Sequence, residues 1–142
     1  MKTLHRVLED KGRDIYRTTP DAMVFEALQE MADRDVGALL VMEGDEVVGI
    51  FSERDYARKI ILLGKSSHDT PVREIMTARV VYARPEQRLD ECLALMTDKR
   101  IRHLPVIEDG GVIGVVSIGD LVKGIIAEQR FIIGQLENYV SG

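Results

Sequence analysis

The stretch Gly49-Ile50-Phe51-Ser52-Glu53-Arg54-Asp55 occurs a second time, in altered form, as Gly114-Val115-Val116-Ser117-Ile118-Gly119-Asp120. Each copy predicts the end of an apolar strand, a turn at the serine and the start of a helix, with an aspartate three residues after the serine. Because strand, turn and aspartate recur together, we expect the function of the chain to involve both copies.

The two copies belong to a longer internal repeat. Of the 36 positions from Pro20 to Asp55, 12 carry the identical residue 65 positions later. Conservative pairs, such as Val48 with Ile113, extend the match. Two copies of about 60 residues are too few for a solenoid, so we expect them to pack on each other and close one core.

Composition limits the possible functions. The chain has 142 residues and a net charge of −5, which argues against nucleic acid as a partner. No apolar run reaches the ~18 residues of a membrane span, and the charged start does not resemble a signal peptide. The single cysteine, Cys92, cannot form an intramolecular disulfide. We therefore expect a cytoplasmic protein without a membrane or nucleic-acid partner.

Apolar periodicity predicts the same order of elements in both repeats: strand, helix, strand, strand, helix. In the first repeat these elements are expected at residues 14–17, at a helix capped by Thr19 that starts with Pro20, at 36–42, at 47–51, and from Ser52 to Gly64. In the second repeat they are expected at residues 80–82, 85–99, 103–107, 112–116, and from Ser117 past Leu136.

The predicted domain organisation has five parts. They are a lead-in helix at residues 1–13, a first repeat at 14–66, a linker with a short helix at 67–76, a second repeat at 77–127 and a C-terminal helical extension at 128–142. The extension is apolar and long. We expect it to have a partner, either the N-terminal helix or a second subunit.

Two β-α-β-β-α repeats that each end in Gly-apolar-x-Ser-x-x-Asp resemble the CBS domain pair, or Bateman module. The resemblance covers essentially the whole chain. It implies an α+β fold in which the two repeats pack with pseudo-twofold symmetry and leave two clefts. It also implies an adenosyl ligand in those clefts, such as AMP, ADP, ATP, NAD or S-adenosylmethionine, and a homodimer formed through the helices.

The resemblance assigns candidate ligand residues. Asp55 and Asp120 are expected to bind the ribose, because one carboxylate can accept a hydrogen bond from each hydroxyl of a diol. Ser52 and Ser117 lie at helix starts, whose free amides suit an anionic group. The family builds adenine slots from positions that here are Ile15, Tyr16, Val36 and Ala38 in one repeat and Val80, Val81, Ile101, His103 and Leu104 in the other. Thr77 matches a ligand-facing hydroxyl, and Arg54, Arg102 and His103 are candidate phosphate contacts.

Helix capping is the alternative interpretation of each Ser-x-x-Asp motif. In a capping box, the serine caps the helix and the acidic residue reaches back to the serine. Two motifs in register within a repeat favour a ligand site in at least one copy, and the serine could serve both roles. The copies differ at Arg54 against Gly119 and at Gly37-Ala38 against Arg102-His103, so we expect two occupiable clefts of different charge.

Other chemistry has little support in the sequence. The three histidines lack zinc-ligand spacing, no carboxylate cluster predicts a metal ion, and Cys92 lies on an apolar helix face. We therefore predict a non-catalytic regulatory module that senses an adenosyl ligand and acts on a protein partner. The alternative is an interaction protein with vestigial clefts that docks through its C-terminal helix.

Overall fold

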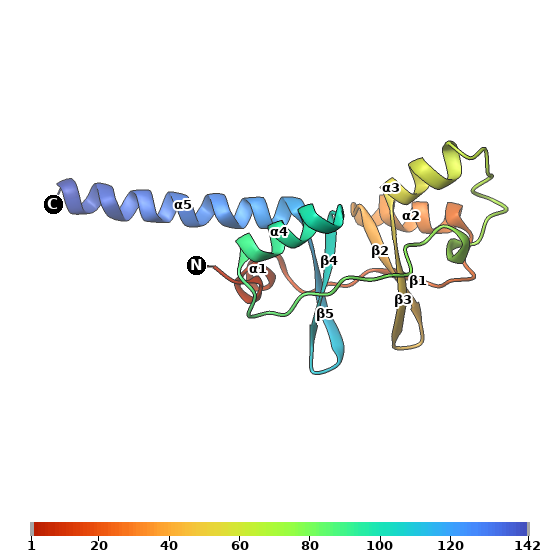
Figure 1. Cartoon of the computed structure of the whole chain (residues 1–142), viewed down its shortest axis with the longest axis horizontal. Helices are drawn as coiled ribbons and strands as arrows, with labels where there is room; N and C mark the ends of the chain where they lie inside the picture. Colours follow the sequence, from red (N-terminus) through yellow and green to blue (C-terminus); the bar gives the residue numbers. More distant parts are fainter. Residues whose placement is uncertain (1, 142) are drawn as a thin grey trace. The chain divides into compact units, whose positions relative to one another are not determined.

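The computed structural model describes residues 2–141, so Met1 and Gly142, the outermost residues of the predicted lead-in helix and C-terminal extension, lie outside the described residues. The chain divides into two compact units, and each contains strands and helices (Figure 1). One unit is the continuous segment Ile15–Val80. The other, discontinuous unit combines the residues before this segment with those after it. The α+β class predicted from the sequence is confirmed.

The continuous unit is built around the hairpin of β2 (Ala38–Glu43) and β3 (Glu46–Ser52), with the short strand β1 (Arg17–Thr18) parallel to β2. Helix α2 (Val24–Arg34) packs on β2. A short helix α3 (Glu53–Asp55) follows β3 and continues as a π-helical segment, Tyr56–Ile61. Apolar side chains from these elements and from the short 3₁₀ helix Val72–Glu74 form the core: Val24, Ala27, Met31, Leu39, Val41, Phe51, Ile60, Val72 and Ile75.

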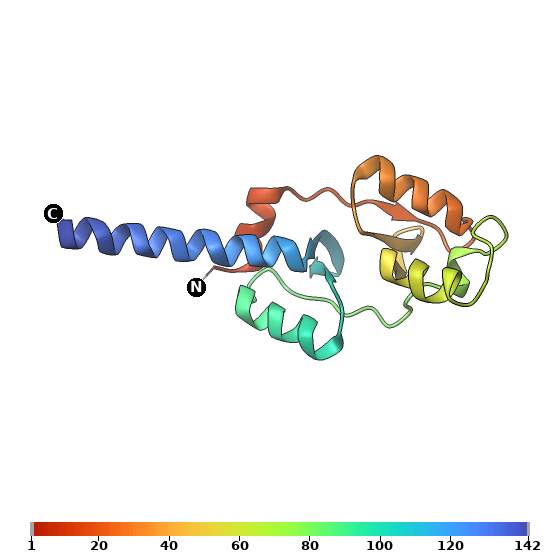
Figure 2. The ribbon, with the colours of Figure 1, turned by 90° about the horizontal axis from the view of Figure 1, so that it is seen from above.

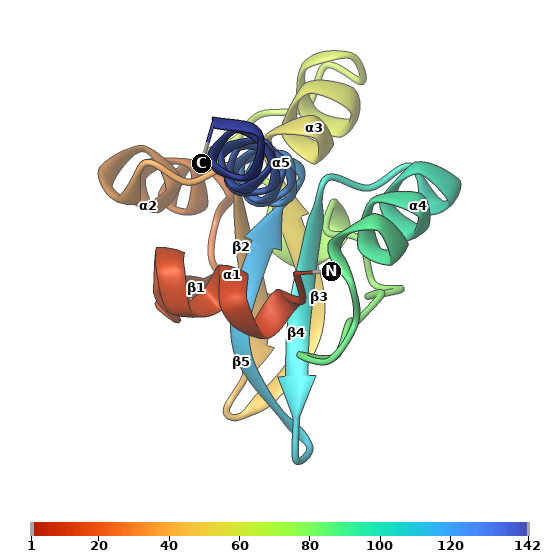
Figure 3. The same ribbon diagram turned by 90° about the vertical axis from the view of Figure 1, so that its left-hand side faces the viewer.

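The discontinuous unit repeats this plan. Strands β4 (His103–Glu108) and β5 (Gly111–Ser117) form its hairpin, and α1 (Leu4–Lys11), α4 (Leu89–Lys99) and α5 (Ile118–Ser141) cover it. Figure 2 and Figure 3 show α1 and α4 on two sides of the first half of α5. Fully buried side chains from all five elements form one core: Leu4, Leu8, Leu89, Cys92, Leu104, Val106, Val116 and Leu121.

Both repeats begin their first helix later than the sequence predicted. The helices were expected to start at Pro20 and Pro85, but α2 starts at Val24 and α4 at Leu89. The residues just before these helices are extended, because Met23 forms a β-bridge with Pro71 and Arg88 forms one with Thr3. Long-range pairing therefore takes precedence over the local capping signal of Thr19-Pro20.

The strand predicted at residues 80–82 is absent from the described chain, and a single parallel bridge joins Ala83 to Val106 instead. In the first repeat, the amide of Leu40 donates to the carbonyl of Tyr16 and extends the strand pairing. Pro105 occupies the equivalent position in the second repeat and has no amide hydrogen to donate. The first-repeat strand, expected at 14–17, is likewise shorter and shifted to Arg17–Thr18.

Each unit is completed by a helical segment that precedes the other repeat in the chain. Helix α1 comes before the first repeat but contributes Leu4, Val7 and Leu8 to the core around the β4–β5 hairpin. The segment after Pro71 comes before the second repeat but contributes Val72 and Ile75 to the core around β2–β3.

Two glycines show that these helical segments are equivalent. A Cβ added at Gly114 would lie 2.6 Å from Cδ2 of Leu8, and one added at Gly49 would lie 2.6 Å from Sδ of Met76. The two glycines are 65 positions apart in the repeat, so the same close approach occurs in both units. A side chain at either position would displace the segment that packs there.

Helix α5 extends well beyond α1 and α4 (Figure 1). Its first half packs on the unit through Leu121 and Gly124, and the carboxylate of Glu128 accepts a hydrogen bond from the amide of Lys2 at 3.1 Å. The N-terminal segment is therefore one partner of the first half of α5. Large apolar side chains farther along the helix remain exposed: Phe131, Ile132, Ile133, Leu136, Tyr139 and Val140.

Candidate functional site

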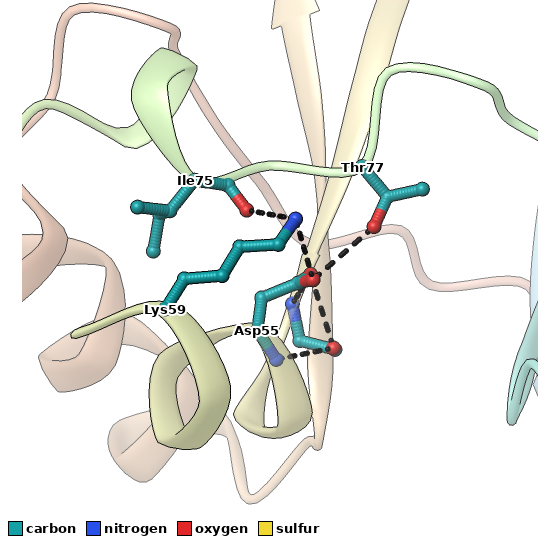
Figure 4. A network of polar contacts seen from close by, with 5 residues as sticks. Asp55, Lys59, Ile75 and Thr77 are labelled. Atoms are coloured by element: carbon teal, nitrogen blue, oxygen red, sulfur yellow. Dashed lines mark hydrogen bonds and ion pairs between the residues drawn. The ribbon is translucent and has the colours of Figure 1, made fainter. Parts of the chain in front are cut away.

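The carboxylate of Asp55 is the centre of a polar network at the end of β3 (Figure 4). Its Oδ2 accepts hydrogen bonds from the amide of Ser52 at 3.0 Å and from the Ser52 hydroxyl at 3.1 Å. Its Oδ1 accepts one from the hydroxyl of Thr77 at 3.2 Å and lies 3.4 Å from Nζ of Lys59. Asp55 is buried, so four donors satisfy a carboxylate that is largely removed from water.

Thr77 is held in place by backbone pairing. Its amide donates to the carbonyl of Ile50, and the Ile50 amide donates to the carbonyl of Thr77. This bridge places the Thr77 hydroxyl beside the first turn of the helix that carries Asp55. The resemblance placed Thr77 at the start of the second repeat, residues 77–127, whereas these contacts place it beside Asp55 in the unit of the first repeat.

Asp120 forms the corresponding network in the discontinuous unit. Its Oδ2 accepts hydrogen bonds from the amide of Ser117 at 2.8 Å and from Nζ of Lys11 at 2.6 Å. Lys11 also donates to the carbonyl of Val115 at 2.8 Å. Burial raises the pKa of Asp120, but the hydrogen bonds from Lys11 and Ser117 outweigh it and hold the pKa below its ordinary value.

Lys11 has the same contacts in its unit that Thr77 has in the other. Thr77 bonds to Asp55 and to the carbonyl of Ile50, whereas Lys11 bonds to Asp120 and to the carbonyl of Val115, the repeat equivalent of Ile50. The repeat offset of 65 residues aligns Thr77 with Gly12, the neighbour of Lys11, so the repeat did not identify Lys11 as a site residue. No sequence signal connects Lys11 to Asp120, because the two are 109 residues apart.

Each aspartate is neutralised by one lysine, but the two lysines come from different elements. Lys59 lies four residues after Asp55 on the same helical segment. Its repeat equivalent is Gly124, where an added Cβ would lie 2.7 Å from Cδ1 of Leu89. Close packing of α5 on α4 therefore leaves no room for a lysine there, and α1 supplies Lys11 instead. The spacing of Asp55 and Lys59 could have revealed the first of these pairs from the sequence.

Basic groups surround Asp120. His103 pairs with Ser117 across the hairpin, and the carbonyl of Arg102 accepts a hydrogen bond from the amide of Ile118. Burial lowers the pKa of His103, and the positive charges of Lys11 and Arg102 lower it further. The negative charge of Asp120 acts in the opposite direction and raises it. In the other unit, Ala38 takes the position of His103 opposite Ser52. The two aspartates therefore have different charged neighbours within their own units.

The remaining predicted residues of the continuous unit lie around its core. Tyr16 and Val36 pack against the core from partly buried positions, and the Tyr16 ring lies 5.2 Å from the guanidinium carbon of Arg34. Ile15 and Arg54 are also partly buried. Direct side-chain contacts therefore gather Ser52, Asp55 and Thr77, whereas Tyr16 and Val36 serve as packing residues.

The predicted apolar slot of the second repeat is also largely packing. Leu104 is fully buried in the core, so its side chain has no surface for a ligand and its backbone alone could take that role. Val81 and Ile101 pack against the same core from partly buried positions. Val80 is the last residue of the continuous unit and is partly buried.

The capping alternative is also observed. Ser52 and Asp55 form a reciprocal capping box, and the amide of Asp120 likewise donates to Oγ of Ser117 at 3.1 Å. Both aspartates thus have a structural role that operates without a ligand. Cys92 is buried in the core, and burial raises the pKa of its thiol to about 11, with Glu91 and Asp90 adding to the effect.

Residues 2–141 bring together no group of three or more His, Cys, Asp or Glu side chains that could hold a metal ion. None of the helices described there has both the length and the apolar character needed to cross a membrane.

Comparison with known families places this fold. The family model of the CBS domain matches residues 12–62 and again residues 72–127, which together cover most of the chain. The chain therefore belongs to the CBS-domain family and carries a tandem pair of these domains.

Individual relatives agree with this placement. The mitochondrial CBS domain-containing protein CBSX3 of Arabidopsis thaliana is 41% identical over 150 residues, which cover 99% of this chain and 72% of the relative. The structure of a protein with CBS domains from Burkholderia ambifaria MC40-6, named for signal transduction, is 52% identical and superposes with a TM-score of 0.87 over 90% of this chain and 96% of that chain.

A more distant structure carries ligands. It is a CBS domain pair in complex with 5′-methylthioadenosine and S-adenosyl-L-methionine. It is 21% identical, with a TM-score of 0.77 over 90% of this chain and 98% of that chain. At this identity the likeness establishes a common fold.

Proposed function

We propose that this CBS pair is a non-catalytic regulatory module that binds an adenosyl ligand through Asp55 and Asp120. The observation that carries the proposal is the recurrence of one polar arrangement in both units. In each unit, a carboxylate in the first turn of a helix accepts a hydrogen bond from the amide of the serine three residues earlier. It accepts another from a side chain of a distant segment, Thr77 or Lys11. A CBS pair in complex with two adenosyl compounds supports this ligand class.

The proposed chemistry is recognition of a ribose diol. A carboxylate accepts hydrogen bonds from two neighbouring hydroxyls, and charge-assisted bonds of this kind are among the stronger ones. Thr77 and Lys11 already contact the carboxylates, so a ribose would share or replace those contacts. Lys11, Arg102 and His103 give the Asp120 site the more basic surroundings, which favours a phosphorylated ligand there.

Regulation requires that the ligand bind two conformations of the chain with different affinities. A ligand shifts the balance between two conformations only by its difference in affinity for them. We propose that a protein partner reads this shift, and that both the ligand and the partner act on a homodimer. Lys11, which donates to Asp120, and Thr77, which donates to Asp55, come from segments distant in sequence, so a ligand that displaces them also loosens those segments.

Calorimetric titration tests the proposal. AMP, ADP, ATP, NAD, NADH and S-adenosylmethionine are titrated into the wild-type chain, Asp55→Asn and Asp120→Asn, with Asp45→Asn in the exposed β2–β3 turn as a matched control. Asparagine keeps an oxygen for the helix cap but loses the charge. Hydrogen bonds to a charged group contribute about 1.5–3 kcal/mol each, so affinity should fall roughly 10- to 100-fold at the altered site.

Three results would decide between a module that binds an adenosyl ligand and an interaction protein without a ligand. Binding that weakens in an aspartate variant but not in Asp45→Asn supports the proposal and identifies the site used. Binding unaffected by either variant would place the ligand elsewhere. No heat with any compound at millimolar concentration would leave the interaction protein as the better description.

A further inference from the structure

Helix α5 carries an apolar stripe that does not pack on its own unit. Val122 and Ile126 lie in the docked half of the helix, yet they remain 43% and 42% exposed. With about 100° of rotation per residue, they lie roughly 100° to 160° around the helix from Leu121 and Glu128, which face the unit. The stripe continues on the projecting half of α5 through Ile133, Leu136 and Val140, which are 54%, 60% and 83% exposed.

The stripe follows a heptad repeat. Ile126, Ile133 and Val140 fall at a positions, and Val122, Gln129 and Leu136 fall at d positions. Apolar residues that recur at a and d over successive heptads are the pattern of a coiled coil, and Gln129 is the one polar residue among these six positions. The g positions are apolar as well: Ile132 and Tyr139 are exposed, and Ile125 is partly buried and also packs against the core of its own unit. A face of this width over a helix of 24 residues is the pattern expected of a helix–helix interface.

We propose that this stripe is the surface on which α5 of a second copy of the chain packs in antiparallel orientation. The proposal is independent of any ligand. The proposed contact between the two copies includes the projecting half of α5. Within residues 2–141, no element of its own unit covers that half.

Charge complementarity selects the antiparallel orientation. In an antiparallel pair, e positions face e positions and g positions face g positions. Lys123 then lies opposite Glu137 of the second copy, and the same pair occurs again on the other side of the twofold axis. The apolar g residues meet one another: Ile125 lies opposite Tyr139 of the second copy, and Ile132 meets its own equivalent.

A parallel pair would be less favourable. It brings g residues against e residues, so Ile125 would face Arg130 of the second copy and Ile132 would face Glu137. Each contact places a charge beside an aliphatic side chain without an opposite charge to match it. The antiparallel pair has one like-charge contact, between the two Arg130 side chains near the axis, where these long groups can diverge into solvent.

Sedimentation equilibrium measures the assembly. The wild-type chain should be dimeric. Ile133→Asp places an unpaired carboxylate in the seam and should weaken dimerisation by at least about 100-fold, since an unpaired charge is strongly disfavoured in an apolar contact. Asn138→Asp adds the same charge on an exposed f position, between one and two turns farther along the helix, and should leave the dimer intact.

Charge reversal tests the orientation. Lys123→Glu and Glu137→Lys should each weaken the dimer by about fivefold to tenfold, because each turns two attractive pairs into repulsive ones. The double variant should recover wild-type affinity. A parallel dimer shows no such rescue, because the two positions are then about 21 Å apart along the helices.

Cross-linking gives a direct readout. A short bismaleimide should join Lys123→Cys to Glu137→Cys in a mixture of the two variants, and neither variant should cross-link to itself. The native Cys92 does not interfere, because it is buried and burial raises the pKa of its thiol to about 11.

Three outcomes would overturn the proposal. One is a chain that remains monomeric at high concentration, which would assign the stripe to a different protein. Another is a dimer that Ile133→Asp leaves unchanged, which would place the contact on another face. The third is self-cross-linking at residue 123 or 137, which would establish the parallel orientation.

Discussion

At the scale of single residues, the two candidate sites are alike in their carboxylates and different in what neutralises them. Asp55 is paired with Lys59 from its own helical segment, whereas Asp120 is paired with Lys11 from α1. The aspartates and serines were predictable, because a capping motif in a repeat is visible in sequence. Lys11 was not, because its contact with Asp120 depends on how α1 packs.

The histidine beside Asp120 makes stability depend on pH. The pKa of His103 is lowered in the folded chain by burial and by Lys11, relative to about 6.5 when unfolded. As the pH falls below about 6.5, the unfolded chain therefore binds a proton that the folded chain does not, and stability decreases. Urea unfolding between pH about 5 and about 8 should show this decrease in wild type and a smaller one in His103→Gln.

Lys11→Met tests the coupling of these groups. Removing the ammonium removes a hydrogen bond that lowers the pKa of Asp120 and a charge that lowers the pKa of His103. Both pKa values should therefore rise, as measured by NMR titration of the two side chains. Lys65→Met, in the other unit, should change neither. Unchanged values in Lys11→Met would contradict the observed contact.

At the scale of elements, the sequence predicted the hairpins well and the helix starts poorly. Both hairpins lie within two residues of their predicted bounds, because an apolar run, a turn cluster and a second run are local signals. The starts of α2 and α4 are set by β-bridges to Pro71 and Thr3, which are long-range contacts. The effect of Pro105 also depends on a long-range contact, because its missing amide hydrogen matters only where another strand would pair with it. The sequence therefore did not reveal that Pro105 shortens the first strand of the second repeat.

The position of α1 predicts an effect that sequence order would assign to the wrong repeat. Leu8 is fully buried in the core around β4 and β5. Leu8→Ala should cost about 2–5 kcal/mol of unfolding free energy, and hydrogen exchange should accelerate at β4 and β5. Leu62→Ala, at an exposed position, is the control. Faster exchange at β2 and β3 alone would contradict the packing of α1.

Two glycines of α5 should respond to alanine with opposite sign. A Cβ at Gly124 would lie 2.7 Å from Cδ1 of Leu89 and 3.3 Å from Cγ2 of Val7, both core residues, so Gly124→Ala should destabilise by about 1–3 kcal/mol. Gly134 has open space around it, so Gly134→Ala should stabilise the helix by up to ~1 kcal/mol. Urea unfolding and helix content by circular dichroism measure the two effects. A loss in both would indicate that residue 134 is packed.

At the scale of the whole molecule, the two units differ in chain continuity. The unit Ile15–Val80 is one uninterrupted segment, whereas the other needs two segments that are far apart in sequence. The repeat predicted two similar halves, and the fold agrees. The repeat did not predict that α1 completes the second repeat and that the segment after Pro71 completes the first. Aligning the two repeats shows which residues are equivalent, but it does not show which core each flanking segment joins.

Fragments should reflect this difference. A peptide of residues 15–80 contains its complete core and should unfold cooperatively, although domains of this size are marginally stable. A peptide of residues 81–141 lacks Leu4, Val7 and Leu8 and should gain cooperative unfolding when residues 2–14 are added. Circular dichroism with urea measures both. Cooperative unfolding of 81–141 alone would contradict an essential role for α1.

The position of α1 also has a consequence for biosynthesis. As the ribosome makes the chain from its N-terminus, α1 emerges early, but Leu121 and the strands it packs against are made more than 90 residues later. The intervening segment can fold in the meantime, because its core residues all lie between Tyr16 and Met76. During this interval the apolar face of α1, formed by Leu4, Val7 and Leu8, is without its native partner, so chaperones that bind exposed apolar segments have access to it.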